Sequence, residues 1–243
     1  MSKKAILALM IAALIPAVSY LLVKFYSERA VKMPPRYFYD SVAVNEKNGK
    51  TTYDTIWHPV KNISFANQLG QKVSLYDIKG KAIVMSFFFT RCPTICPQMT
   101  KAMKKLQDSF KGTVRKKSDT SFVQFISVSI DPLHDSVVQL RKFADRYKVD
   151  PDNWWMVSGD RKETYEFALQ EMKASVADAE VDTGFIHTYN FFLLDREKII
   201  RGWYNAFDSS AQKRLVRDIP LLMLEKERKK TFGEFLKELF GRS

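Results

Sequence analysis

The residues best suited to redox or metal chemistry are few, because the chain of 243 residues holds two cysteines, Cys92 and Cys96, and three histidines. Two cysteines are too few for a disulfide scaffold or for a zinc site built from four thiolates. Their spacing places both sulfurs on one face of a first helical turn, where they reach one metal ion or each other. A helix N-terminus and the neighbouring Arg91 favour the thiolate, the form that binds metals and exchanges disulfides.

His187 is the histidine that best fits as a third ligand. It lies in residues 184–188 (GFIHT), just before an expected hairpin. In a thioredoxin-type fold this loop packs opposite the cysteine helix and normally carries a threonine followed by a cis-proline, but here Thr188 leads into Tyr189. Two thiolates and one imidazole suit Cu(I), and with a water they suit Cu(II). Zinc fits by ligand type alone, although a structural zinc site needs a fourth protein ligand.

Three interpretations of the cysteine pair stay open at this level. The pair forms a soft-metal site with His187, or a dithiol oxidoreductase in which one thiol attacks and the other resolves. In the third interpretation the two residues are merely small and buried after a core strand. We expect His58 and His134 to be exposed polar residues, and Met99 and Met103 to belong to the core rather than to a copper site.

The elements that must position these residues alternate between strands and helices. Residues 81–89 (KAIVMSFFF) form a continuous apolar run of strand length, and residues 97–110 have the spacing of an amphipathic helix. Further strands are expected at 62–65, 72–75, 121–130, 154–157, 189–195 and 198–204, and further helices at 136–147, 161–172 and 212–224. This order predicts an α/β fold, a thioredoxin-like sandwich with a central mixed β-sheet flanked by helices.

The N-terminal region predicts a membrane anchor. Residues 5–23 (AILALMIAALIPAVSYLLV) are uncharged and long enough, as a helix, to cross one hydrocarbon core. A cleaved signal peptide is less favoured, because the apolar run continues beyond its small-residue site, and a buried core helix would need a polar face. The expected division is residues 1–4 in the cytoplasm, 5–23 as the transmembrane anchor, 24–60 as a tether, 61–224 as the thioredoxin-like domain and 225–243 as a charged amphipathic extension.

The charge balance is basic, with 39 Lys and Arg against 27 Asp and Glu and a net charge of +12. The basic residues are spread through the chain without a nucleic-acid motif, so we expect no nucleic acid among its partners. One local concentration follows the cysteine turn, where residues 101–117 hold seven basic residues and one acidic residue. We interpret this stretch as a solvated helix face or as a surface that steers docking onto an acidic partner.

Several motifs around the cysteine turn occur together. They are residues 87–93 (FFFTRCP) with Cys96, Pro97 and Met99, residues 129–132 (SIDP) with Asp135, His187-Thr188 with Leu194-Asp195, and residues 67–80. With them, about residues 62–224 resemble the Sco/SenC family of copper proteins, assembly factors of cytochrome c oxidase. The chain departs from the family pattern at Ile186, where an acidic residue usually precedes the histidine, and in the extension from residue 225.

The resemblance implies a tethered thioredoxin-like domain that faces the periplasm or its equivalent. Because the N-terminal region lacks the features of a transit peptide, we expect a single-pass protein of the bacterial inner membrane. It implies one copper ion held by Cys92, Cys96 and His187, received from an upstream donor and passed to subunit II of cytochrome c oxidase or a similar acceptor. On this basis we expect a metallochaperone rather than an enzyme. The alternative is a thiol:disulfide oxidoreductase that uses Cys92 and Cys96 to keep the acceptor's cysteines reduced.

Overall fold

A computed structural model describes residue 12 and residues 14–23, 32–47, 50–111, 122–174, 180–182 and 185–225. The chain divides into two units, Met1–Met33 and Pro34–Ser243. In the first unit residues 14–23 are helical, and residues 5–11 and 13 of the expected anchor lie outside the described residues. None of the helices within the described ranges combines the length and the apolar character needed to cross a membrane.

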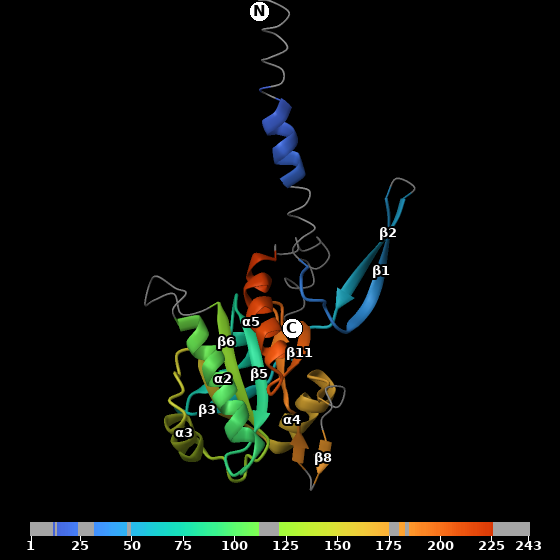
Figure 1. The fold of residues 1–243 in the computed structure, drawn as a ribbon. Coiled ribbons are helices and arrows are strands. Elements are labelled where there is room, and N and C mark those ends of the chain that lie inside the picture. The colour runs from blue at the N-terminus through green and yellow to red at the C-terminus, as the bar shows by residue number, and fades with distance from the viewer. Residues whose placement is uncertain are drawn as a thin grey trace, which may run out of the picture. The chain divides into compact units, whose positions relative to one another are not determined.

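A seven-stranded mixed sheet forms the centre of the second unit (Figure 1). Its order is β11 (Ile200–Asn205), β10 (Asn190–Leu194), β5 (Ala82–Phe88), β6 (Val123–Ser129), β7 (Trp154–Ser158), β3 (Ser64–Asn67) and β4 (Lys72–Ser74). Strands β5, β6 and β7 are parallel, whereas β10 pairs with β5 and β3 pairs with β7 in the antiparallel sense. Every residue of β5 and β6 is buried, as the continuous apolar run of β5 predicts for a central strand.

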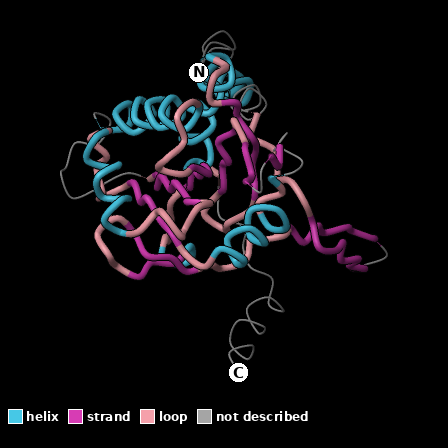
Figure 2. The backbone as a smooth tube through the Cα atoms, turned by 90° about the horizontal axis from the view of Figure 1, so that it is seen from below, coloured by secondary structure: helices cyan, strands magenta, loops and turns pink. Residues whose placement is uncertain are grey.

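Helices cover both faces of this sheet (Figure 2). On one face lie α2 (Ile95–Lys111), α3 (Val137–Arg146) and α5 (Ser209–Leu224), whose buried side chains share a core with Val84, Phe125 and Trp154. Because α2 and α3 each connect neighbouring parallel strands in the same direction, right-handed crossovers place both on this face. The other face is covered by η1 (Leu75–Asp77), α4 (Arg161–Glu166) and the π-helical turn η2 (Phe167–Glu171).

Most elements expected for residues 62–224 are present with small shifts in their bounds, and Met99 and Met103 are buried in the core as expected. The helix expected at residues 161–172 is instead α4 followed by η2. Helix α5 begins three residues early because Asp208 accepts the Ser210 N–H and caps it.

Two short hairpins were not predicted. The interval of residues 24–60, expected as a tether, contains β1 (Tyr39–Lys47) and β2 (Lys50–Trp57), an antiparallel pair that projects from the body of the unit (Figure 1). The available signal was weak, because Val42 and Val44 flank Ala43 and polar residues lie only on either side of this triplet. The second hairpin is β8 (Glu180–Asp182) with β9 (Phe185–His187), which replaces the loop expected around residue 187.

A buried arginine fastens the incoming chain and the end of α5 to the sheet. The Arg201 side chain is 1% exposed and donates hydrogen bonds to Asp195 at 2.9 Å and to Glu225 at 2.6 Å. The same guanidinium also donates to the carbonyl oxygens of Pro34 and Pro35. Asp195 follows β10, whose last residue Leu194 pairs with Ile83 near the start of β5. Residues 34–36 therefore join the domain at the end of the sheet opposite the cysteine turn, which follows the end of β5.

Replacement of Arg201 by alanine should destabilise the fold by about 3–5 kcal/mol, because it leaves the buried carboxylate of Asp195 without its main cationic partner. Equilibrium unfolding in urea, followed by tryptophan fluorescence, measures the change. Lys142→Ala on the exposed side of α3 is the control and should cost less than about 0.5 kcal/mol. Equal effects of the two substitutions would contradict the role assigned to Arg201.

Candidate metal centre

The turn between β5 and α2 brings the two cysteines together. Cys92 lies four residues beyond the end of β5, and Cys96 is the second residue of α2. The Cys96 backbone N–H donates to the Cys92 Sγ at 3.4 Å. Both thiols are free and nearly buried, with 6% and 3% of the residue exposed. Pro97 fits here because the first turn of a helix does not use its missing N–H.

The two thiols differ in their electrostatic surroundings. Burial disfavours the Cys92 thiolate, but hydrogen bonds from Cys96 and from the backbone N–H groups of Thr94 and Ile95 outweigh it and lower the pKa of Cys92. Burial is the main reason that the pKa of Cys96 is raised, and the charges of Cys92 and Asp135 act in the same direction. The pair therefore contains one thiol that ionises more readily than an ordinary cysteine and one thiol that keeps its proton until a metal or a disulfide replaces it.

Asp135 holds the backbone that leads into the cysteines. This fully buried carboxylate accepts hydrogen bonds from the Thr90 N–H at 3.1 Å, from the Thr90 hydroxyl at 2.5 Å and from the Ser129 hydroxyl at 2.5 Å. Thr90 stands two residues before Cys92, and Ser129 ends β6. The carboxylate therefore ties the cysteine turn to the neighbouring parallel strand.

A second carboxylate supports the outer side of the same turn. Asp131 accepts hydrogen bonds from Arg91 at 2.8 Å and from His134 at 2.9 Å. Burial alone would raise the pKa of Asp131, but these two partners outweigh it and lower the pKa. His134 is half-exposed, as expected, and serves this ion pair rather than the cysteines.

His58 differs from the expectation of an exposed polar residue. Its side chain is 25% exposed and lies between Asp40 Oδ1, at 2.7 Å, and Glu171 Oε2, at 3.1 Å. The β1–β2 hairpin, which the residue pattern did not predict, brings Asp40 to His58. His58 therefore connects the base of this hairpin to η2, away from the cysteines.

His187 ends β9, and its backbone pairs in register with Glu180 of β8. Strand β9 lies beside β5, the strand that leads to the cysteine turn. The side chain of His187 lies outside the described part of the structure, so its role as a third ligand stays a prediction. Among the side chains that are described, no group of three His, Cys, Asp or Glu residues is arranged to hold a metal ion.

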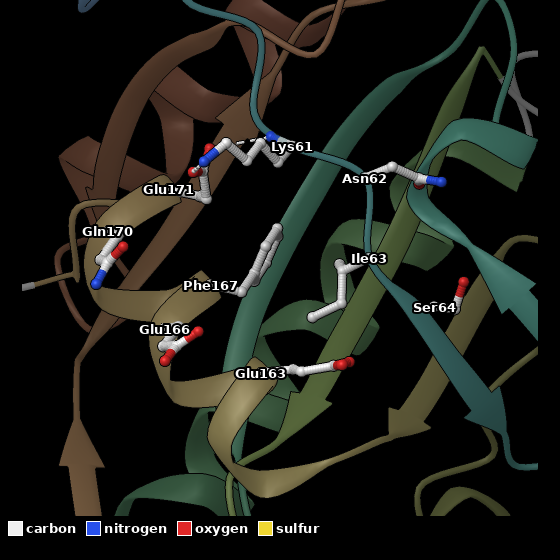
Figure 3. Close-up of a pocket in the computed structure, with 9 residues that line it drawn as sticks. All are labelled: Lys61, Asn62, Ile63, Ser64, Glu163, Glu166, Phe167, Gln170 and Glu171. Atoms are coloured by element: carbon white, nitrogen blue, oxygen red, sulfur yellow. Dashed lines mark hydrogen bonds and ion pairs between the residues drawn. The ribbon is translucent and has the colours of Figure 1, made fainter. Parts of the chain in front are cut away.

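A groove of about 390 Å³ lies on the other face of the sheet, between residues 61–64 and α4–η2 (Figure 3). Glu171 points toward Lys61 there, and its carboxylate accepts the Lys61 backbone N–H at 3.0 Å and pairs with the ammonium at 3.3 Å. Burial opposes ionisation of Glu171, but Lys61 and His58 outweigh it and lower the pKa of Glu171. Neither cysteine lines this groove, so it is separate from the candidate metal centre.

The mixed sheet, its flanking helices and a cysteine pair at a strand-to-helix turn define a thioredoxin-like protein. The chain belongs to the SCO1/SenC family, whose family model matches residues 59–223. The predicted fold of the domain and the predicted family are thus confirmed. The β1–β2 hairpin precedes the matched residues.

Three known proteins illustrate the likeness. The SCO1 protein homolog of Bacillus subtilis (strain 168) is 34% identical over 172 residues, which cover 70% of this chain and 86% of that protein. The structure of BsSco, described as a Sco family cytochrome c oxidase assembly protein with a disulfide switch, has 32% identity and a TM-score of 0.59, and covers 71% of this chain and 98% of BsSco. Bradyrhizobium japonicum ScoI with copper bound has 21% identity and a TM-score of 0.51, and covers 66% of this chain and 99% of ScoI. This last likeness shows the fold alone.

Alkylation should distinguish the two thiols. In the reduced protein at pH 7, iodoacetamide should modify Cys92 before Cys96, because the lower pKa of Cys92 supplies more thiolate. The alkylation rate of Cys92 should rise with pH and level off below the ordinary pKa of a cysteine. The alkylation rate of Cys96 should still be rising at that pH, because its pKa is raised. Peptide mapping by mass spectrometry follows both rates, and faster modification of Cys96 would contradict this assignment.

Replacement of Asp135 by alanine should destabilise the domain by about 2–4 kcal/mol, because the partly buried Thr90 N–H and the buried Ser129 hydroxyl lose their acceptor. Thermal unfolding monitored by circular dichroism measures the loss. Asp108→Ala on the exposed side of α2 is the matched control and should cost less than about 1 kcal/mol. An unchanged melting temperature for Asp135→Ala would show that the carboxylate does not support the turn.

Proposed function

We propose that this chain is a membrane-tethered copper chaperone that binds one copper ion through Cys92, Cys96 and His187. It assists assembly of the binuclear copper site of cytochrome c oxidase subunit II. The observation that carries the proposal is the pair of buried free thiols at the start of α2 in a member of the SCO1/SenC family.

The chemistry of the donors supports copper. Soft thiolate ligands select Cu(I), and an added imidazole also suits Cu(II). Structural zinc sites use four protein ligands, which exceeds the two thiolates and one histidine proposed here.

The residues around the pair have separate tasks in this proposal. Cys92 ionises more readily than an ordinary cysteine, because hydrogen bonds lower its pKa, whereas Cys96 must lose its proton when it becomes a ligand. Asp135 holds the turn through Thr90, so the two sulfurs are positioned before the cargo arrives. Copper affinity should therefore increase with pH as Cys96 gives up its proton more readily.

The apolar N-terminal run of residues 5–23 supports the location that we propose. Residues 5–23 anchor the chain in the bacterial inner membrane, residues 24–60 connect the anchor to the domain, and the domain of residues 61–224 faces the periplasm. The charged extension of residues 225–243 follows it. An upstream donor supplies the copper, and subunit II or a similar copper protein receives it.

A second candidate function is thiol:disulfide exchange. The favourable observation is the contrast between an activated Cys92 and a protonated Cys96 within one turn. Cys92 would attack a target disulfide, and Cys96 would then displace the target thiolate, which leaves a Cys92–Cys96 disulfide and a reduced target. The disulfide switch described for BsSco supports this alternative.

A Cu(I) titration of the reduced protein against a chromophoric chelator tests the proposal. The wild type should bind one copper, and Cys96→Ser and His187→Ala should each weaken binding by more than the 10–100-fold that loss of a merely supporting residue costs. His134→Ala is the control, because His134 serves Asp131, and it should stay within about tenfold of the wild type.

The result separates the two functions. Copper binding that is indifferent to His187→Ala would refute the three-ligand site. If that variant also kept the ability to reduce a disulfide substrate, thiol exchange would become the favoured function.

A further inference from the structure

The three helices on one face of the sheet present a basic surface to solvent. Among their described side chains, eight exposed residues are basic and two are acidic. The basic residues are Lys101 and Lys105 of α2, Arg141, Lys142 and Arg146 of α3, and Lys213, Arg214 and Arg217 of α5, and the acidic residues are Asp108 and Asp145. We call this surface the basic helix layer.

The helix on the opposite face of the sheet has no such excess of exposed basic residues, so the net charge of the chain alone does not explain the basic helix layer. There the exposed residues Arg161 and Lys162 of α4 are balanced by the exposed Glu163 and Glu166 of the same helix. Lys162 also pairs with Glu166 at 3.9 Å. The excess of positive charge in the helices is thus concentrated on one side of the sheet.

The basic helix layer extends to the end of the sheet that carries the cysteines. Helix α2 starts within the cysteine turn, and α3 starts two residues after Asp135, which bonds Thr90 in that turn. Helix α5 follows β11, whose last residue Asn205 pairs with Asn190 at the same end of the sheet. The basic pairs at residues 141–142 and 213–214 therefore lie in the second turn from this end.

Some basic residues of the stretch 101–117 do not belong to this surface. The Lys104 side chain is only 20% exposed and pairs with Asp108, so the charges of this pair cancel locally. Residues 112–121 lie outside the described residues. Within the layer itself, Arg217 pairs with Asp218 at 3.0 Å, so its charge is partly neutralised. The basic charge instead spreads across three helices that are distant in sequence.

We propose that the basic helix layer docks an acidic face of the protein that exchanges copper with Cys92 and Cys96. The copper exchange itself rests on the proposed function. A protein partner is favoured over an anionic bilayer, because residues 34–36 fasten the incoming chain to the opposite end of the sheet. A domain held by that end keeps its cysteine end and the adjoining basic pairs available to a protein. Charge complementarity of this kind accelerates association and fixes orientation.

Three matched charge reversals in the full-length chain, purified in non-ionic detergent, test the proposal. Arg141→Glu with Lys142→Glu, and Lys213→Glu with Arg214→Glu, each change one basic pair of the layer. Arg161→Glu with Lys162→Glu changes the same kind of pair on the opposite face and is the control. The probe is the soluble copper-binding domain of a cytochrome c oxidase subunit II, and stopped-flow mixing at increasing NaCl gives its association rate.

The wild-type rate should fall steeply as salt increases. At low salt each reversal in the layer should slow association about tenfold and flatten the salt dependence, whereas the control should change it less than about twofold. Equal effects of all three reversals, no salt dependence, or no association of the wild type would overturn the proposal. The proposal would also be overturned if the two reversals in the layer lost binding to vesicles that contain phosphatidylglycerol but associated with the subunit II domain at the wild-type rate.

A copper titration of the same variants separates this proposal from the proposed function. Each reversal should bind Cu(I) as the wild type does, because none of the changed residues is a proposed ligand. Charge-dependent association without tight copper binding would support the docking surface and refute the chaperone role. Tight copper binding with charge-independent association would support the chaperone role and refute the docking surface.

Discussion

The hydrogen bonds that Asp135 accepts from Thr90 and Ser129 join the cysteine turn to the central strands, and the site depends on them. Strands β5 and β6 are buried along their whole length, so their ends are placed with little freedom. A fully buried carboxylate is costly unless donors surround it, and here three donors do so. The turn is therefore rigid before any cargo or substrate reaches the thiols.

This rigid turn gives two identical side chains different chemistry. Cys92 receives the N–H groups at the start of α2, whereas Cys96 is buried one turn further along and faces negative groups. One readily ionised thiol beside one protonated thiol suits soft-metal capture and disulfide exchange alike. The two proposed functions therefore share one structural basis, and the third ligand and the partner decide between them.

Much of the fold and part of the site were predictable from local patterns. The apolar run of residues 81–89, the helical spacing of Met99 and Met103, and the cysteine spacing each depend on neighbours in sequence, and each prediction agrees with the structure. The β1–β2 hairpin was missed because its alternation is short and rich in polar residues. The environment of His58 was missed for the same reason, since Asp40 reaches it only through that hairpin.

The sequence by itself determined the strand–helix order, the position of the thiols at a helix start and the resemblance to a copper-protein family, because these follow from short-range spacing and residue type. The tertiary structure decided which distant groups act on those thiols and on one another. Asp135 lies 43 residues after Cys92 in the chain yet raises the pKa of Cys96 and holds the turn, and Arg201 binds Pro34 across the sheet end. The basic helix layer likewise exists only because right-handed crossovers put α2 and α3 on one face, where α5 joins them.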